Sequence, residues 1–442
     1  MRKILQLILR FLSRLILWKY RPFVVVVTGS VGKTSHKEAI FTVLNYRFWG
    51  LVRRNEKNLN TEIGVPITII GGIEARRNVF KWLWNFARAA AQILLPMSYP
   101  KILVLEMGAD RPGDIRYLTS FIKPDIAVVT AIGKMPPHLE FFSSREEYIA
   151  EKANAVSRLK IGGAALLNFD DEAVRKIADG IGKDKRIIFY GFGDGAEIRS
   201  AEAVLRLPAG QAGLPESPKK IESAGLVFKM EYKSKTVPFR VFGTASTALI
   251  YAAMAAAGVG IEKGMNFIEL SEAISTIKAL PGRLRFLEGI KYSTIIDDTY
   301  NASPLSTELA LNLLSRFKER RRLAVLGDMK ELGPNTEAAH RHIGRLAALN
   351  CDLAVLVGEA MVFAEEELVR AGFEEDKNLF WFGNVEKTKR PLQEMIKEGD
   401  AILFKGSQSM RLEKAVEEVM ARPELRGELL VRQDKYWRNK PV

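Results

Sequence analysis

The feature that most constrains this chain is the stretch FVVVVTGSVGKTS at residues 23–35. Its five consecutive apolar residues, four of them valines, predict a strand buried on both faces. The chain then turns through Gly29 and Gly32, and a helical pattern begins at Thr34. Glycines at such a turn let backbone N–H groups close around phosphate oxygens, so the stretch predicts a phosphate-binding loop.

The loop pattern is G-x-x-G-K-T, which is shorter than the full phosphate-loop pattern because Val27 stands at the place of its first glycine. In such loops the lysine, here Lys33, brings a positive charge to the β- and γ-phosphates, and the next hydroxyl, here of Thr34, ligates Mg²⁺. The alternative is an ordinary strand–turn–helix corner without a ligand. The valine run directly before the loop and the helix directly after it favour a nucleotide site.

The composition is that of a globular protein. A chain of 442 residues, 47% hydrophobic and 27% charged, predicts two or three domains with cores of their own. The single cysteine, Cys351, excludes an intramolecular disulfide and suits a reducing compartment. No small-residue cleavage site follows the apolar N-terminus, so we expect no cleavable signal. The expected location is cytoplasmic, either free or peripheral on the inner face of the cytoplasmic membrane.

Most of the formal net charge of +14 lies in the first hundred residues, which hold 16 Lys and Arg against four Glu. Such a basic quarter indicates an anionic partner, either nucleic acid or a membrane surface. Residues 1–22 carry six basic residues and no acid, and their polar residues recur every three or four positions. This pattern predicts an amphipathic helix that is too short and interrupted to span a bilayer. The helix lies either in the headgroup region or on the protein's own core.

Residues 77–95 repeat this pattern, with Lys81, Asn85, Arg88 and Gln92 as a second thin polar stripe. Two basic, aromatic-rich amphipathic segments favour a membrane surface, and the two segments could equally pack against each other. Their basic residues are interleaved with Leu, Ile and Trp instead of forming an exposed basic groove, so we do not expect a nucleic-acid partner.

The β/α alternation that follows the loop predicts an α/β fold. After a helix at 34–46, residues 53–70 are predicted as a polar loop that leads past Gly64 and Pro66 into a β-branched strand. The Pro/Gly-rich residues 207–220 predict an exposed insertion. The remaining predicted elements of the first part are strands at 101–106 and 125–130, helices at 144–156, 244–258 and 267–279, and a hairpin that turns at residues 233–234.

The residues PGR at 281–283 mark the predicted domain boundary. Beyond it, strands at 292–297, 322–327, 353–357, 379–382 and 400–405 alternate with helices. The predicted organisation is a basic amphipathic helix at 1–22, a central phosphate-loop ATPase domain with a parallel sheet at 23–281, and a doubly wound, Rossmann-like α/β domain at 282–442.

Glu106 stands at the C-terminal end of the predicted strand 101–106. In a sheet that carries a phosphate loop, this edge faces the ligand crevice, so Glu106 is a candidate Mg²⁺ ligand. The alternative is a solvated residue at a strand end. His138, in a loop, and Lys152, in a helix, carry no signal of this kind by themselves.

The chain resembles the Mur ligases, a family of ATP-dependent amide ligases of cell-wall synthesis, over about residues 23–420. Each matching motif is weak alone, but nine in order are specific. EMGA, DD-Y-NA-P, GDM-ELG and KGS together resemble the branch that adds D-alanyl-D-alanine to a UDP-N-acetylmuramoyl-tripeptide. The matching motifs are TGSVGKTS, NLNTEIGVP, EMGADRPGDI, the H-L-E-x-F of HLEFF, EKANAV, PGR, DDTYNASP, LGDMKELG and KGSQSMRLE.

The resemblance implies a role for each matching residue. Lys33, Glu106, His138 and Lys152 correspond to catalytic residues. Thr34 and Glu106 would ligate one Mg²⁺ and His138 a second, and Lys152 matches a lysine that several members carbamylate, which turns it into a metal-binding carboxylate. The implied nucleotide-binding residues are Gly29, Ser30, Val31, Gly32, Lys33, Thr34, Ser35, Arg283, Asp298, Tyr300 and Asn301. The implied substrate-binding residues are Asn60, Thr61, Asp328, Glu331, Lys405 and Ser407.

The reaction that the resemblance implies uses ATP and two Mg²⁺ ions. A carboxylate of a cell-wall precursor attacks the γ-phosphate to give an acyl phosphate, and the amine of a dipeptide then displaces phosphate. We expect a monomer. The alternatives from other functional classes are a membrane-associated NTPase or binding protein without ligase activity, and a nucleic-acid-binding NTPase.

Three departures from the family pattern leave the acceptor open. The family usually carries a UDP-binding domain before the phosphate loop, and here only 22 residues precede the strand, so we expect that domain to be lacking. Residues 243–251 read GTASTALIY where members tend to carry H-N-x-x-N. Gln408 stands where this branch often has a basic residue. A different or lipid-linked acceptor is therefore an alternative to the UDP-linked one.

Overall fold

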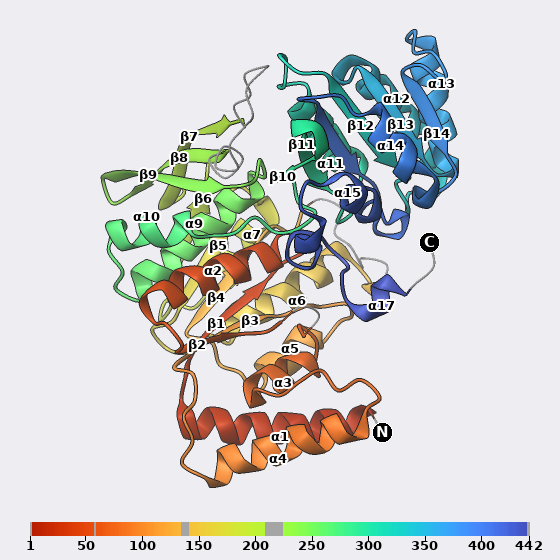
Figure 1. Ribbon diagram of the computed structural model, residues 1–442. Helices are drawn as coiled ribbons and strands as arrows, with labels where there is room; N and C mark the ends of the chain where they lie inside the picture. Colours follow the sequence, from red (N-terminus) through yellow and green to blue (C-terminus); the bar gives the residue numbers. More distant parts are fainter. Residues whose placement is uncertain (1, 57–58, 134–140, 208–223, 440–442) are drawn as a thin grey trace. The chain divides into compact units, whose positions relative to one another are not determined.

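The computed structural model describes residues 2–56, 59–133, 141–207 and 224–439. The chain divides into two units (Figure 1). The first comprises residues 1–203, 228–240 and 247–277, and the second comprises 204–227, 241–246 and 278–442. His138 and nearly all of the predicted insertion at 207–220 lie outside the described residues.

The larger sheet is organised around the strand of the phosphate loop. Its strands are β1 (Phe23–Thr28), β2 (Val52–Arg54), β3 (Ile102–Glu106), β4 (Ile126–Val129), β5 (Ala164–Asn168), β6 (Arg186–Gly191), β7 (Ile198–Arg206), β8 (Gly225–Tyr232) and β9 (Lys235–Phe242). They lie in the order β2-β3-β1-β4-β5-β6-β7-β8-β9. The pairs from β2 to β7 are parallel, and β1 lies between β3 and β4. The carboxyl ends of β1 and β3, which carry Thr28 and Glu106, therefore meet at one edge.

Helices cover both faces of this sheet. The four valines of β1, which point alternately to the two faces, are therefore all buried. On one face Val24 and Val26 join a core that includes Leu9 and Tyr148. The helices of this unit are α1 (Arg2–Tyr20), α2 (Lys33–Arg47), α3 (Gly64–Ile70), α4 (Val79–Leu94), α5 (Asp114–Thr119), α6 (Arg145–Ser157), α7 (Glu172–Ile177), α9 (Ala248–Glu262) and α10 (Phe267–Ser275). In Figure 1, α1 and α4 lie side by side at the bottom of the view.

The second unit is a doubly wound α/β sheet. Its strands are β10 (Arg285–Glu288), β11 (Thr294–Asp298), β12 (Arg322–Gly327), β13 (Leu353–Val357), β14 (Leu379–Phe382) and β15 (Ala401–Lys405), in the order β10-β11-β15-β12-β13-β14. Buried residues on its two faces form two separate cores. Its helices are α11 (Pro304–Leu314), α12 (Thr336–Asn350), α13 (Val362–Arg370), α14 (Lys389–Met395), α15 (Glu413–Val419), α16 (Arg426–Leu429) and α17 (Lys435–Arg438).

The predicted fold class is confirmed, with two mostly parallel sheets flanked by helices. The sheets are mixed, not purely parallel. β10 pairs antiparallel with β11, and the sequence analysis did not identify this edge strand. β8 and β9 are joined by the predicted two-residue turn, in which Lys233 and Ser234 have φ of 46° and 63°. Two consecutive residues with positive φ are the geometry of a tight hairpin.

The strand predicted at the end of residues 53–70 is wrong, because residues 64–70 form helix α3. All seven residues of α3 are buried, so no alternation of polar and apolar residues marks the helix. Pro66 falls in the first turn, where a missing N–H costs nothing, and the Thr68 hydroxyl donates to the Gly64 carbonyl at 3.1 Å. Burial on every side therefore overrides the β-propensity of the branched residues.

None of the helices in the described part of the chain has the length and apolar character that a bilayer crossing needs.

Candidate active site

The phosphate loop runs from the end of β1 to the start of α2. Gly29 has φ of 138°, and a Cβ atom there would lie 2.1 Å from Thr130 Oγ1. Gly32, the residue before α2, has φ of 85°. Both positions need glycine, the first for the close approach of Thr130 and the second for its left-handed backbone. The loop therefore delivers the first turn of a fifteen-residue helix to the edge of the sheet.

Two of the predicted phosphate-binding amides have a protein partner. The N–H groups of Ser30 and Val31 both donate to the Ala131 carbonyl, at 2.8 and 3.1 Å. The Lys33 ammonium bends back over the loop and donates to the Gly29 and Ser30 carbonyls, each at 2.9 Å. The first-turn amides of α2 have no acceptor within their own helix and carry the positive end of its dipole, so they are the donors best placed for an anion.

Glu106 and Thr34 meet at this edge, as the sequence predicts for a shared site. The Thr34 hydroxyl lies 3.3 Å from Glu106 Oε1, and the Asn60 amide donates to the same oxygen at 3.2 Å. Glu106 is buried, not a solvated strand end. The hydroxyl of Thr61, the other predicted substrate residue here, accepts the N–H of Gly64, the first residue of α3, at 3.2 Å.

Two buried residues beside Glu106 were missed by the sequence analysis. Lys37, 1% exposed, places its ammonium 3.6 Å from Glu106 Oε2 and 3.1 Å from Glu38 Oε1. Asn55 accepts the Glu106 N–H at 2.8 Å and donates to the Glu106 carbonyl at 3.0 Å. Lys37 could have been identified from the sequence, because its position in the predicted helix places a charged residue on the side that faces the sheet. The contact of Asn55 is tertiary, and nothing in the sequence indicates it.

Lys152 lies inside the protein on α6. It is 1% exposed, and its ammonium lies 4.7 Å from the centre of the Tyr148 ring. Burial, followed by the charge of Lys33, lowers the pKa of Lys152 to about 7. The Tyr148 hydroxyl in turn contacts Ser30 Oγ at 2.9 Å, which ties α6 to the loop. The lowered pKa raises the fraction of neutral amine at neutral pH, and the neutral amine is the form that reacts with carbon dioxide.

His36, the fourth residue of α2, stabilises the loop. Its Nδ1 lies 2.8 Å from the Gly32 carbonyl, so this nitrogen carries the proton, and its Nε2 lies 3.2 Å from the Tyr190 hydroxyl. Complete burial lowers the pKa of His36 to about 4, against a smaller opposing effect of the Gly32 hydrogen bond. The neutral imidazole therefore holds the left-handed Gly32 in place at neutral pH.

The donor set at this edge fits Mg²⁺. A hydroxyl and a carboxylate oxygen, from Thr34 and Glu106, are the hard oxygen ligands that Mg²⁺ binds beside nucleotide phosphates. Within the described residues no group of three or more His, Cys, Asp and Glu side chains is arranged to hold an ion. A metal here would therefore complete its shell with phosphate oxygens and water.

In the second unit, the predicted loop residues form one hydrogen-bonded cluster at the ends of β11 and β15. The Lys405 ammonium pairs with the Asp298 carboxylate and donates to the Asn301 carbonyl at 3.1 Å. The Gln408 N–H lies 3.3 Å from Asn301 Oδ1. Lys405 is buried, and a buried charge needs a partner. Asp298 provides this partner within the cluster.

Arg283 and Tyr300 lie together in the same unit. The Arg283 guanidinium stands 4.1 Å from the centre of the Tyr300 ring, a cation–π contact. Asp297, one residue before Asp298, accepts the Gly282 N–H at 2.9 Å and the Thr299 hydroxyl at 2.6 Å. Burial raises the pKa of Asp297 to about 6, and these hydrogen bonds oppose the rise.

Asp328 and Ser407, both predicted substrate residues, are joined through the backbone. The Ser407 N–H donates to the Asp328 carbonyl at 3.0 Å, and the Lys330 N–H donates to Ser407 Oγ at 2.8 Å. Asp328 Oδ2 accepts from the Lys330 ammonium at 2.8 Å, while its Oδ1 is buried without a hydrogen-bond partner in the described residues. Glu331 is exposed and has φ of 65°. The orphaned carboxylate oxygen leaves Asp328 with an unused acceptor.

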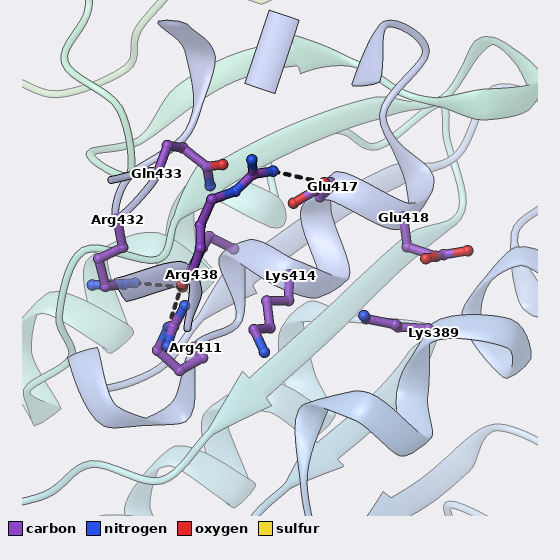
Figure 2. A pocket seen from close by; sticks show the side chains of 9 residues that line it. Lys389, Arg411, Lys414, Glu417, Glu418, Arg432, Gln433 and Arg438 are labelled. Atoms are coloured by element: carbon purple, nitrogen blue, oxygen red, sulfur yellow. Dashed lines mark hydrogen bonds and ion pairs between the residues drawn. The ribbon is translucent and has the colours of Figure 1, made fainter. Parts of the chain in front are cut away.

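A cavity of about 220 Å³ in the second unit has none of the residues predicted from the sequence in its lining (Figure 2), although its Arg432 donates to the Tyr300 carbonyl at 3.1 Å. Several of its charged groups are paired with one another, and Lys389 and Lys414 pair with Glu386. Glu413 accepts from Arg411 at 2.6 Å and from Arg432 at 2.7 Å, and Arg438 lies 3.8 Å from Glu417. These ion pairs fasten the C-terminal segment onto α15.

The comparisons with known proteins agree with this arrangement. The model of the Mur ligase middle domain matches residues 86–259, and the model described as "Mur ligase, glutamate ligase domain" matches residues 282–408. A UDP-N-acetylmuramoyl-tripeptide–D-alanyl-D-alanine ligase of Bacillus subtilis is 27% identical over 90% of this chain and 76% of its own length. The corresponding enzyme of Haemophilus influenzae is 26% identical over 90% of this chain and 77% of its own length.

Solved structures show the same fold. The MurF ligase of Thermotoga maritima, in complex with ADP, superposes with a TM-score of 0.67 at 27% identity, over 93% of this chain and 83% of that one. A MurF structure from Acinetobacter baumannii gives a TM-score of 0.73 at 23% identity, over 93% of this chain and 79% of that one. The resemblance inferred from the motifs is confirmed, and the chain belongs to the Mur ligase family of enzymes, whose middle and C-terminal domains it contains.

Proposed function

We propose that this chain is an ATP-dependent amide ligase that joins D-alanyl-D-alanine to a UDP-N-acetylmuramoyl-tripeptide or a close analogue through an acyl phosphate. The observation that carries the proposal is the meeting of Thr34 and Glu106 beside Lys33, in a phosphate loop of a Mur ligase family chain. The names of the relatives and the ADP bound to the Thermotoga maritima enzyme support it. The proposed domains are an ATPase domain at 23–281 and an amine-binding domain at 282–442.

In this proposal the loop binds the triphosphate of ATP. The first-turn amides of α2 would hold phosphate oxygens, and Lys33 would leave the Gly29 and Ser30 carbonyls to contact the β- and γ-phosphates. Lys33 neutralises negative charge while the γ-phosphoryl group is transferred. Asn55 would fix the Glu106 backbone, and Lys37 would hold the Glu106 carboxylate in place.

Thr34 and Glu106 are the proposed ligands of one Mg²⁺, which would shield the triphosphate from the incoming carboxylate. His138 is proposed for a second ion, with Lys152 as the carbamate that the family resemblance implies. The depressed pKa of Lys152 supports this modification, because only the neutral amine reacts with carbon dioxide.

The proposed reaction is a pair of substitutions. An oxygen of the acceptor carboxylate forms a bond to the γ-phosphorus while the bond from that phosphorus to the β–γ bridging oxygen breaks, and ADP leaves. The deprotonated amine of the dipeptide then attacks the acyl carbon. The carbon–oxygen bond breaks, and phosphate leaves with the oxygen that came from the carboxylate.

The second unit would bind the amine substrate. Asp328 supports this role, because its buried Oδ1 lacks a hydrogen-bond partner among the described residues and could accept from a substrate ammonium. Lys405 and Ser407, with the exposed Glu331, complete the proposed substrate set, and Arg283, Asp298, Tyr300 and Asn301 are proposed to contact the nucleotide.

The test is a product assay with the full chain, ATP and Mg²⁺. ADP release is measured with UDP-N-acetylmuramoyl-tripeptide alone, with D-alanyl-D-alanine alone and with both, and the product is identified by mass. ADP release that requires both substrates, together with a product heavier by one dipeptide less water, is expected. ADP release without any new amide product would contradict the proposal.

Two variants make the assay specific. Lys33→Ala removes the loop ammonium, and Lys183→Ala removes an exposed lysine of the same unit as the matched control. Product formation should be lost with the first variant and kept with the second.

A further inference from the structure

The outer surfaces of α1 and α4 are apolar. Large apolar side chains are exposed at the helical spacing of one stripe on each helix, and Phe80 is 82% exposed. We call this surface the apolar platform. Its members are Ile4, Leu7, Ile8, Phe11 and Trp18 on α1, and Val79, Phe80, Leu83, Trp84 and Leu94 on α4.

Three uncharged polar residues of the two helices face the protein interior. Asn85 and Gln92 are buried on α4, and Ser13 is buried on α1. Asn85 exchanges two hydrogen bonds of 2.9 Å with the backbone of Ile73. Ser13 Oγ and Gln92 Oε1 are buried without a hydrogen-bond partner in the described residues. A helix with polar groups inside and aromatic rings outside is inverted with respect to a helix that faces water.

The platform is a fixed part of the first unit. The Lys19 ammonium, at the end of α1, donates to the carbonyls of Gln92 at 2.8 Å and Leu95 at 2.6 Å, at the end of α4. The Tyr20 hydroxyl donates to the same Gln92 carbonyl at 2.8 Å. At the other end of α1, the Tyr117 hydroxyl of α5 donates to the Gln6 carbonyl at 2.8 Å. These contacts hold the two helices side by side (Figure 1) with their apolar stripes outward.

The charge on the two helices themselves has one sign, and beside them Glu62 pairs with Arg2 and Glu74 pairs with Arg76. Residues 2–20 and 79–94 contain no Asp or Glu. A second copy of this chain would bring the same basic border against the platform, so like charges oppose a symmetric dimer there. An anionic surface is complementary to it. The exposed basic residues in and beside the two helices include Lys3, Arg14, Lys19, Arg21, Arg77 and Lys81, together with Arg2 and Arg76, which have acidic partners.

We propose that the apolar platform docks on the surface of an anionic lipid bilayer, with α1 and α4 lying in the headgroup region. The exposed rings and branched side chains enter the acyl boundary, and the basic border contacts lipid phosphates. Neither helix spans the bilayer. This inference is independent of the proposed ligase activity, because it rests on the surface and not on the phosphate loop.

The docking places the phosphate loop close to the membrane. α1 ends at Tyr20, and β1 runs from Phe23 to Thr28 directly before Gly29. Six strand residues span about 20 Å. An acceptor held at the membrane surface would therefore be within reach of the loop, which suits the lipid-linked alternative for the substrate.

The test is flotation of the full chain with vesicles, at low and high salt. One set contains phosphatidylglycerol and phosphatidylethanolamine, and the other contains phosphatidylcholine only. We expect flotation with the anionic vesicles at low salt, a loss of binding as salt rises, and weaker binding to phosphatidylcholine. Replacing Lys3, Arg14 and Lys81 by Gln should lower the partition coefficient by about two orders of magnitude, at roughly fivefold for each charge.

The apolar part is tested with the double variant Phe11→Gln and Phe80→Gln. Each substitution should weaken binding by about tenfold or more. The matched control is Ile268→Gln with Leu349→Gln, which removes two equally exposed apolar residues from helices outside the platform. Circular dichroism and the urea midpoint establish that each variant is folded.

Three outcomes would overturn the inference. The first is full-length protein that stays in solution with anionic vesicles at low salt. The second is a dimer in sedimentation that the platform variants dissociate, which would identify a second copy as the occupant. The third is binding that the control pair weakens as much as the platform pair. Because none of these readouts uses ATP turnover, a failed ligase assay leaves this test unaffected.

Discussion

The ammonium of Lys37 lies 3.6 Å from Glu106 Oε2, while the Thr34 hydroxyl contacts Oε1 of the same buried carboxylate. The lysine therefore compensates a charge that the proposed metal site needs to keep. Removing one partner of a buried ion pair leaves the other charge unpaired in a medium that solvates it poorly.

Lys37→Met should lower the free energy of unfolding by about 3 kcal/mol, because the buried Glu106 loses the counter-charge beside it. Urea denaturation of the unliganded chain measures the change. Lys123→Met, at an exposed lysine, is the control and should change stability by less than about 0.5 kcal/mol. Equal stability of the two variants would mean that the Lys37 pair is energetically neutral.

Lys33→Ala should reduce ATP turnover by a factor of about a thousand or more, since it removes charge stabilisation at the transferring phosphoryl group. It should leave the fold intact, because the Lys33 ammonium contacts loop carbonyls and is not part of the core. Steady-state ADP release and a thermal melt measure the two effects. Wild-type turnover in this variant would refute the phosphate-loop assignment.

His36 should make the protein acid-sensitive. Its pKa is about 4 in the folded chain against an ordinary value of 6.5. Between these pH values the unfolded chain binds more protons than the folded chain, so stability falls as pH drops from about 6.5 towards 4. Urea midpoints measured across this range should decline less steeply in His36→Gln than in the parent chain. A slope in His36→Gln equal to that of the parent chain would contradict this role of His36.

Lys152 should form a carbamate. Its pKa is lowered to about 7, so the neutral amine, which is the form that reacts with carbon dioxide, is present at neutral pH. Labelling with ¹³C-bicarbonate should give a carbamate carbon signal in the parent chain that is missing in Lys152→Ala. A short exogenous carboxylate should partly restore the activity of that variant. A fully active Lys152→Ala chain without added carboxylate would refute the role.

Asp328→Asn should raise the KM for the dipeptide by about tenfold or more while the KM for ATP stays constant. The carboxylate would pair with the substrate ammonium, and a hydrogen bond to a charged group contributes about 1.5–3 kcal/mol. Initial rates at varied dipeptide concentration measure this. Asp376→Asn, in an exposed turn of the same unit, is the control. An unchanged KM for the dipeptide would remove Asp328 from the amine site.

The parts of the fold that depend on local sequence could be predicted. The valine strand, the glycine turn and α2 follow from residues 23–35 alone, and the meeting of Thr34 with Glu106 follows from the common edge of a parallel sheet. The parts that depend on tertiary contacts could not. α3 is helical because it is buried on all sides, and Asn55 reaches Glu106 from a separate loop.

The two amphipathic helices illustrate the same limit. Their polar stripes were visible as a period of three to four residues, but the pattern does not say which side faces the protein. Only the structure shows Asn85 and Gln92 inside and Phe80 and Trp84 outside. The sequence analysis therefore left open both membrane docking and packing on the protein, and each helix has one face packed and one face free.

The most direct test of the central proposal follows an oxygen atom from the acceptor to phosphate. UDP-N-acetylmuramoyl-tripeptide labelled with ¹⁸O in its terminal carboxylate is incubated with the full chain, Mg²⁺, ATP and D-alanyl-D-alanine, and the released phosphate is analysed by mass. An acyl phosphate route transfers one ¹⁸O into each phosphate that accompanies an amide bond. Phosphate without label, released at the same rate as ADP, would mean that water is the nucleophile and that the chain is an NTPase and not a ligase.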